Sequence, residues 1–302
     1  MTESHKTIRS KRGKFSSFWQ TYARNKSALL GLTFLIVLIL ATLLIGYIFP
    51  SDPTSPDLSN VMHPPSLQFP FGSDYLGRDQ VTLIAYGARP SLIIAFTAGA
   101  ILAMLGTIMG MSAGYFGGKV DGIIMRTTDV FLTIPTLPLI LLIVAVMGAN
   151  LTNVMLTIGL TSWPSMARIV RADTLSLMKR EFIDIEKVMG ASVGRIVFRH
   201  LLPNQLNSIL VYTSLSIPVV ILTEAGLEFL GLAPLSISWG FMLNTSISYW
   251  ITGAWWLSFF PGFAIFSTAL AFYFVSEGLK EALSPKLKRR REFLSVQLAG
   301  KK

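Results

Sequence analysis

The sequence contains no cysteine, only three histidines and few charged residues. Without cysteine the chain cannot form a disulfide, a thiol nucleophile or a cysteine-ligated metal site. Charged residues make up 14% of the chain, whereas a soluble domain usually carries about 25%. Hydrophobic residues reach 52%. An ordinary soluble domain is therefore excluded, and the net charge of +10 must be explained by where the charges lie.

Charges are missing from long stretches of the chain. The uncharged stretches are residues 28–49, 90–118, 130–167, 201–223 and 229–276. The first has 22 residues, and at about 1.5 Å per residue a helix of that length crosses a hydrocarbon core of about 30 Å. It is also longer than the apolar run of a signal peptide, about 7 to 15 residues, and no small-residue cleavage site follows it. We expect an uncleaved first membrane span.

The later stretches divide into further spans. The third is too long for one helix and has a polar, helix-breaking centre at residues 148–153, which predicts two helices joined by a tight turn. In the last stretch, residues 231–248 are rich in Ser, Gly, Pro and Asn and indicate a loop, which leaves one span over about residues 258–278. The predicted fold is an all-α integral membrane protein with six transmembrane helices.

The basic residues follow the positive-inside rule. Seven Lys and Arg precede residue 28, seven lie in residues 168–199 and eight in residues 277–302, which is 22 of the 26 in the chain. Both termini are therefore expected in the cytoplasm of a multi-pass protein of the plasma or inner membrane. The short segment 119–129 then lies inside and the turn at Gly148 outside. Basic clusters that flank spans and lack interleaved aromatics favour anionic lipid over nucleic acid as their partner.

This topology divides the chain into consecutive segments. They are a basic cytoplasmic N-terminus (1–27), the first transmembrane helix (28–50), an extracytoplasmic loop (51–89), a five-helix core (90–280) with a cytoplasmic loop (172–202), and a basic cytoplasmic tail (281–302).

The predicted spans contain no ionisable residue, and the histidines all lie in loops or at a helix start. Proton relays and ion-driven transport need ionisable groups within the bilayer, which argues against a stand-alone secondary transporter or channel. No Gly-x-x-x-x-Gly-Lys-Ser/Thr loop is present, so the chain is expected to have no ATPase site, no cofactor and no metal site of its own. Energy for active transport would have to come from another subunit.

Small residues and prolines mark places where helices pack or bend. Glycine recurs every four residues at Gly106, Gly110, Gly114 and Gly118, which lines one helix face with small residues. This face serves either packing within the chain, which we favour, or a subunit interface. Pro135 and Pro138 in the third span and Pro218 in the fifth are expected to kink or loosen their helices. The kinks are either ordinary features of membrane helices or hinges for gating.

The charged loop between the fourth and fifth spans predicts a short amphipathic helix. Its apolar stripe, at helical spacing, consists of Phe182, Ile185, Val188 and Met189. Charged residues flank the stripe at Glu181, Asp184, Glu186 and Lys187. Gly190 provides a helix stop, and Pro203 suits the first turn of the next span. A helix lying on lipid is the alternative, but its acids would face anionic headgroups, so a protein groove is the better partner.

This loop resembles the signature loop of type-I ABC-transporter permeases, in which a small acidic helix and a glycine precede a Leu-Pro pair, here Leu202-Pro203. Asp184-Ile185-Glu186 stands where the family has Glu-Ala-Ala, and His200 replaces the common Ile. The resemblance implies that the loop docks on a cytoplasmic ATPase through Glu181, Phe182, Asp184, Ile185, Glu186, Lys187, Gly190, Ala191 and Pro203.

Other segments are similar to the "C" permease subunit of dipeptide, oligopeptide and nickel importers. They are residues 24–28, 71–79, 86–92, 113–118, 124–129, 255–256, 260–262 and 277–286. This resemblance implies a type-I ABC importer permease fold, a homologous second permease subunit, two ATP-binding subunits that hold ATP and Mg, and an extracytoplasmic substrate-binding protein. It implies peptides as cargo, with nickel chelates or oligosaccharides as alternatives. A membrane-embedded structural or assembly subunit is a further alternative.

Polar and aromatic residues outside the spans have simpler interpretations. In the outer loop, Gly72, Gly77, Asp74 and Asp79 suit turns, and Arg78 is free to pair with an Asp, so a structural role is favoured over ligand contact. An outer aromatic belt is predicted at Tyr249, Trp250, Trp255 and Trp256. Arg168 and Arg171 are expected to end the fourth span at the inner headgroups.

Overall fold

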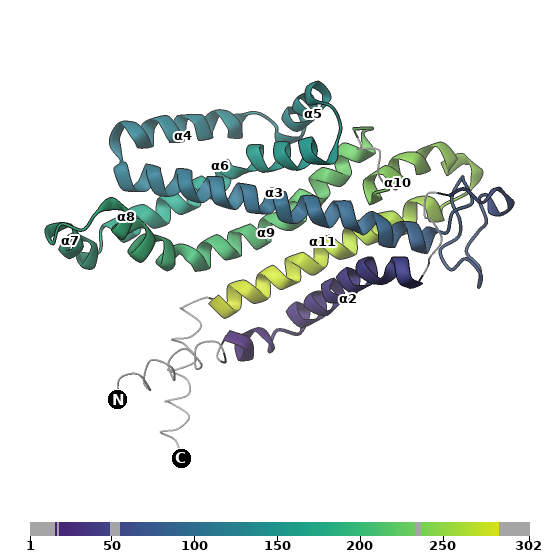
Figure 1. The fold of residues 1–302 in the computed structure, drawn as a ribbon, viewed down its shortest axis with the longest axis horizontal. Coiled ribbons are helices and arrows are strands. Elements are labelled where there is room, and N and C mark those ends of the chain that lie inside the picture. The colour runs from purple at the N-terminus through teal and green to yellow at the C-terminus, as the bar shows by residue number, and fades with distance from the viewer. Residues whose placement is uncertain (1–15, 17, 49–54, 233–236, 284–302) are drawn as a thin grey trace, which may run out of the picture.

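The computed structural model describes residues 16, 18–48, 55–232 and 237–283 (Figure 1). The predictions for the basic residues before Ser16 and for the tail beyond Leu283 lie outside the described residues. In the described part the regular elements are helices, apart from one antiparallel bridge between Ser73 and Asp79. The long helices are α2 (Lys26–Ile48), α3 (Gln80–Phe116), α6 (Leu151–Met178), α9 (Leu202–Phe229) and α11 (Trp256–Leu283).

Shorter helices connect or cap the long ones. They are η1 (Leu58–Asn60), α4 (Gly118–Thr133), α5 (Thr136–Met147), α7 (Glu181–Val188), α8 (Val193–Arg195), the π-helical η2 (Ile196–Leu201), α10 (Trp239–Ser246) and η3 (Ile247–Thr252). In Figure 1, α2 and α11 lie side by side below α3, while α4 and α5 lie above it. One end of the bundle holds the N-terminus of α2, the C-terminus of α11 and helix α7 (Figure 1). The other end holds α10 and the loop of residues 55–79.

Four helical segments of the described chain are long and apolar enough to cross a membrane, or five if the bent pair α4 and α5 counts as one span. The four are Lys26–Gly46, Gln80–Phe116, Val193–Phe229 and Trp256–Leu283. The remaining predicted span corresponds to α6, which begins after the expected turn at Gly148. Hydroxyl and amide side chains, together with Arg168 and Arg171, dilute the apolar residues of α6.

The recurring glycines of α3 form a close seam with α6. A Cβ atom at Gly106 would lie 2.5 Å from the Met166 side chain, and one at Gly114 would lie 2.6 Å from the Thr174 Cβ. At Gly110 it would lie 2.5 Å from the Ala167 carbonyl oxygen. The described residues thus place this small-residue face against a helix of the same chain. Gly118 lies beyond the seam, where a Cβ would meet nothing within 4 Å.

The segment 119–129, which is expected on the inner side of the membrane, is helical: it belongs to α4, which packs on α3 and α6. Arg171 of α6 binds both carboxylate oxygens of Asp121 at 2.5 Å, and Arg168 lies 2.5 Å from Asp129. The paired charges allow both helices to continue past them. The two arginines therefore tie α6 to α4, and they do not stop the helix, which continues to Met178.

The predicted loop over residues 231–248 is wrong in part, because α10 occupies residues 239–246. Ser238 caps this helix, and its hydroxyl accepts a hydrogen bond from the Phe241 N–H. The buried Trp239 donates its indole N–H to the Ile84 carbonyl at 2.8 Å, which attaches α10 to α3. Residues 233–236 lie outside the described part.

The outer loop has the ion pair that the sequence suggests, between Arg78 and Asp74 at 2.5 Å. Trp256, however, is buried and donates its indole N–H to the Ser73 carbonyl at 3.0 Å. It therefore holds the loop against α11 and cannot anchor the chain in an aromatic belt. Trp250 and Trp255 are exposed, in keeping with that belt, and Tyr249 stacks on Tyr75.

Candidate functional site

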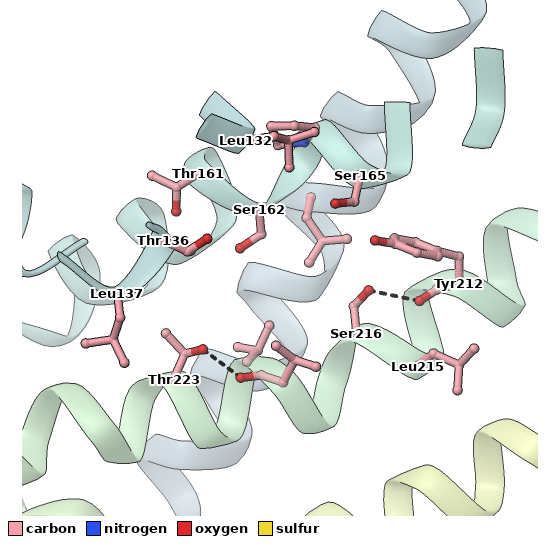
Figure 2. A pocket seen from close by; sticks show the side chains of 14 residues that line it. Leu132, Thr136, Leu137, Thr161, Ser162, Ser165, Tyr212, Leu215, Ser216 and Thr223 are labelled. Atoms are coloured by element: carbon pink, nitrogen blue, oxygen red, sulfur yellow. Dashed lines mark hydrogen bonds between the residues drawn. The ribbon is translucent and has the colours of Figure 1, made fainter. Parts of the chain in front are cut away.

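Two features of the structure carry functional chemistry: the helix α7 at one end of the bundle and a polar cavity among the helices (Figures 1 and 2). Helix α7 is short, with Glu181 and Asp184 in its first turn and Lys187 in its last. Acidic residues near the N-terminus and a basic residue near the C-terminus complement the helix dipole. Lys187 also lies 3.4 Å from Asp184.

The apolar residues of α7 divide into one buried anchor and an exposed face. Ile183 has no exposed surface. It packs with Met166 and Val170 of α6 and with Ile196 and Leu201 of η2. The predicted stripe faces outward: the exposed fraction is 40% for Phe182, 59% for Ile185, 88% for Val188 and 78% for Met189. We call these four residues the docking face. The spacing of the stripe identified this face, but it missed Ile183, which lies outside the stripe.

Gly190 ends α7 in a Schellman motif. Its N–H donates to the Lys187 carbonyl, and the N–H of Ala191 donates to the Glu186 carbonyl, both at 3.0 Å. Gly190 has φ of +75°, and a Cβ there would meet nothing within 4 Å. The position needs glycine because of its backbone conformation, since there is ample space for a side chain.

The loop is attached to the following helix. His200 Nε2 lies 3.2 Å from a Glu186 carboxylate oxygen, and the Asn204 amide donates to the His200 carbonyl at 2.6 Å. Pro203 is the second residue of α9, which fits the predicted first-turn position. Helical structure begins earlier, however: α8 and η2 continue directly into α9, and together they form one helical rod over Val193–Phe229.

A cavity of about 400 Å³ lies where α5, α6 and α9 meet α3 (Figure 2). Its lining contains no Asp, Glu, Lys, Arg or His. It is rich in hydroxyl groups, which come from Thr136, Thr161, Ser162, Ser165, Tyr212, Ser216 and Thr223. This cavity is not predicted from the sequence, although the hydroxyl residues within the predicted fourth span indicate a polar surface on α6.

The cavity hydroxyls fall into two groups. Three donate to main-chain carbonyls one turn back: Thr161 to Thr157 at 2.7 Å, Ser216 to Tyr212 at 2.9 Å and Thr223 to Val219 at 2.8 Å. The other four, on Thr136, Ser162, Ser165 and Tyr212, have no hydrogen-bond partner among the described residues. In Figure 2 the Tyr212 hydroxyl points from α9 into the space opposite α6.

The prolines lie beside this cavity. The chain bends by 91° between α4 and α5, at Pro135, and the flanking residues Leu132 and Thr136 line the cavity. Pro138 lies in the first turn of α5. Pro218 lies within α9, close to Ser216, and the helix continues through it. The sharp break thus occurs at Pro135 only, among the three predicted kinks.

Two buried acids lie on α9, where none was expected. The uncharged stretch of the fifth predicted span ends at residue 223, but α9 continues to Phe229, and the exposed fractions of Glu224 and Glu228 are 1% and 0%. The Ser91 hydroxyl donates to Glu224 at 3.0 Å, and the Ser238 hydroxyl donates to Glu228 at 2.6 Å. The helix does not stop at these acids because α3 and α10 cover them and supply their hydrogen-bond donors.

Two family models match the sequence. Residues 106–289 match the family described as the inner membrane component of binding-protein-dependent transport systems. Residues 14–65 match the N-terminal transmembrane domain of oligopeptide transport permease C.

Similar proteins extend over nearly the whole chain. The dipeptide transport system permease of Bacillus subtilis is 38% identical over 274 residues, which cover 90% of this chain and 85% of that protein. The oligopeptide transport system permease of the same organism is 35% identical, with 91% and 92% covered. The glutathione transport system permease of Pectobacterium atrosepticum is 38% identical, with 93% and 94% covered.

Proposed function

The chain belongs to the family of inner membrane components of binding-protein-dependent transport systems, and from this premise we propose that it forms the pathway for peptides in an ATP-driven importer. It is a multi-pass membrane protein and a permease subunit of an ABC importer. In the proposed arrangement six helices span the bilayer, with α6 and the α4–α5 pair as spans, and both termini lie in the cytoplasm.

The docking face of α7 carries this proposal. Val188 and Met189 are almost fully exposed, although the rest of the loop is anchored through Ile183. Apolar side chains held outward on an anchored helix need a partner, because their burial stabilises a complex by about 25 cal/mol per Å². Glu181, Asp184 and Glu186 beside this face favour a protein groove with basic residues over anionic lipid.

We infer from this face and from the family which partners complete the importer. A cytoplasmic ATPase subunit would receive α7, and a second such subunit would receive the corresponding helix of a homologous second permease. ATP and Mg would bind to the ATPase subunits, and an extracytoplasmic protein would deliver the cargo. Dipeptides and oligopeptides are the proposed cargo, since relatives with these names are 38% and 35% identical. Nickel chelates or oligosaccharides are the alternative.

Site-specific crosslinking tests the proposal, and the lack of native cysteine makes each introduced thiol unique. Single-cysteine variants Ile185→Cys, Val188→Cys and Met189→Cys would be incorporated into the assembled importer in membranes. Each is expected to crosslink to the ATPase subunit, because its side chain is exposed on the docking face. Ile183→Cys is the matched control on the same helix, and its buried side chain should give no adduct.

Absence of an ATPase adduct at all three exposed positions would defeat the coupling role and favour a structural or assembly subunit. An adduct at Ile183→Cys as strong as at Val188→Cys would show that α7 does not dock in the observed orientation. Reconstitution of the chain alone tests the remaining alternative, a stand-alone secondary transporter or channel. Peptide uptake in the absence of any ATPase would favour that alternative over the importer.

A further inference from the structure

The cavity of Figure 2 combines many hydrogen-bonding groups with no charged side chain. A hydroxyl group supplies one donor and two acceptor lone pairs. The hydroxyls of Thr161, Ser216 and Thr223 have used their donor on the main chain and keep acceptor capacity toward the cavity. The unpartnered hydroxyls of Thr136, Ser162, Ser165 and Tyr212 keep both functions.

This lining favours cargo groups that are polar but neutral. A charged group that leaves water needs an opposite charge, and among the described residues the cavity lining offers none. Glu224, the neighbour of the lining residue Thr223 in the sequence, is not part of the lining and accepts a hydrogen bond from Ser91. A neutral amide needs only one acceptor for its N–H and one donor for its carbonyl, and the two groups of hydroxyls supply both.

The walls hold these groups on rigid elements. Ser162 and Ser165 project from α6, and Tyr212 and Ser216 project from α9 across the cavity. The volume of about 400 Å³ falls within the range of small-ligand pockets. Leu102, Leu137 and Leu215 also line the cavity and offer apolar contact to the side chains of a peptide.

We propose that this cavity is a cargo-contact site in which neutral hydroxyl groups hydrogen-bond to the main-chain amide groups of a peptide, a contact that every peptide can make whatever its side chains. This inference rests on the proposed function as a peptide permease, and it assigns contact residues within the pathway. Tyr212, Ser165 and Ser162 make the principal contacts, because their hydroxyls have no partner among the described residues and line the cavity from α9 and α6.

The test uses the complete importer with its binding protein in proteoliposomes. The probes are Ala-Ala, Lys-Ala and Asp-Ala, which share a main chain and differ in charge. Tyr212→Phe and Ser165→Ala each remove one free hydroxyl, and Ser214→Ala is the matched control on α9, since its hydroxyl bonds to the Val211 carbonyl and does not line the cavity. Uptake of each peptide is compared with wild type, together with ATPase activity stimulated by the binding protein.

Each cavity variant is expected to slow uptake of all three peptides about 3- to 10-fold and to the same extent, as the loss of one hydrogen bond predicts. The control should remain within about 2-fold, and stimulated ATPase activity should persist in Tyr212→Phe, which removes a single oxygen atom. Uptake unchanged in both cavity variants, or a loss confined to one charge class, would overturn the inference while leaving the permease function intact.

Failure of the proposed function has a different signature. A wild-type importer that takes up neither these dipeptides nor a longer peptide such as Ala-Ala-Ala-Ala, or that takes up a trisaccharide and no peptide, would overturn the peptide permease and this inference with it. If a cavity variant does not assemble, Tyr212→Phe alone decides, because the ring and its packing remain in place.

Discussion

The seam between α3 and α6 provides a quantitative test of the fold. A Cβ at Gly110 would lie 2.5 Å from the Ala167 carbonyl oxygen and 2.8 Å from the Val170 Cβ. Normal contact requires roughly 1 Å more, and both obstacles are part of a helix that cannot rotate away. Overpacking of this kind costs about 1–3 kcal/mol. Gly110→Ala is therefore expected to push the helices apart and destabilise the chain.

Gly122→Ala is the matched control, because Gly122 lies in α4 and a Cβ there meets nothing within 4 Å. Both substitutions gain the same helix propensity, at most about 1 kcal/mol, so the difference between the variants isolates the steric term of about 1–3 kcal/mol. Thermal unfolding of the purified importer in detergent, followed by tryptophan fluorescence, measures that difference. Equal midpoints for the two variants would refute the observed α3–α6 packing.

Two further predictions concern the ends of the molecule. Gly190→Ala is expected to lower the amount of peptide imported per ATP hydrolysed. A residue with a Cβ is destabilised by about 1–2 kcal/mol at φ of +75°, so the substitution disturbs the end of α7. The control is Gly194→Ala, which has equal space around it and should leave this ratio unchanged. In the outer loop, hydrogen bonds from Ser59 and Asn60 hold the pKa of Asp57 below its ordinary value. The stabilisation of the loop by these bonds is therefore fully present at a pH above the ordinary pKa, and it is lost as the pH falls through the lowered pKa. Protection of the Ser59 amide against hydrogen exchange should therefore decrease as the pH is lowered into the acid range. Protection that does not change with acid pH would contradict the prediction.

Features set by local sequence were predictable. The uncharged residues from 28 to 48 lie in α2, the polar centre of the third stretch contains the turn before Leu151, and the closely spaced Asp74 and Arg78 form an ion pair. Pairing over long sequence separations was not predictable. Asp121 and Arg171 neutralise each other across two helices, so a short charged segment is part of a packed helix.

The buried acids and the cavity show the same limit. Glu224 looks like the first residue of a loop until Ser91, which lies 133 residues away, appears as its hydrogen-bond donor. The hydroxyl residues of α6 are visible in the sequence, but which hydroxyls bond to their own helix depends on side-chain geometry. Tyr212 stands out only because its phenol is free and faces the other wall of the cavity.

The packing of Ile183 connects the two functional features. This residue belongs to one cluster with Met166 of α6 and Ile209 of α9, and each of these lies within one helical turn of a cavity residue, Ser165 and Tyr212. Hydrogen bonds between Gln205 and Thr174 join the same two helices beside the cluster. Because a close-packed cluster transmits displacement, a movement of α7 would shift the two cavity walls together with their hydroxyls. In the proposed importer, a displacement of α7 by the ATPase would therefore reach the cavity without any contact between the ATPase and the peptide.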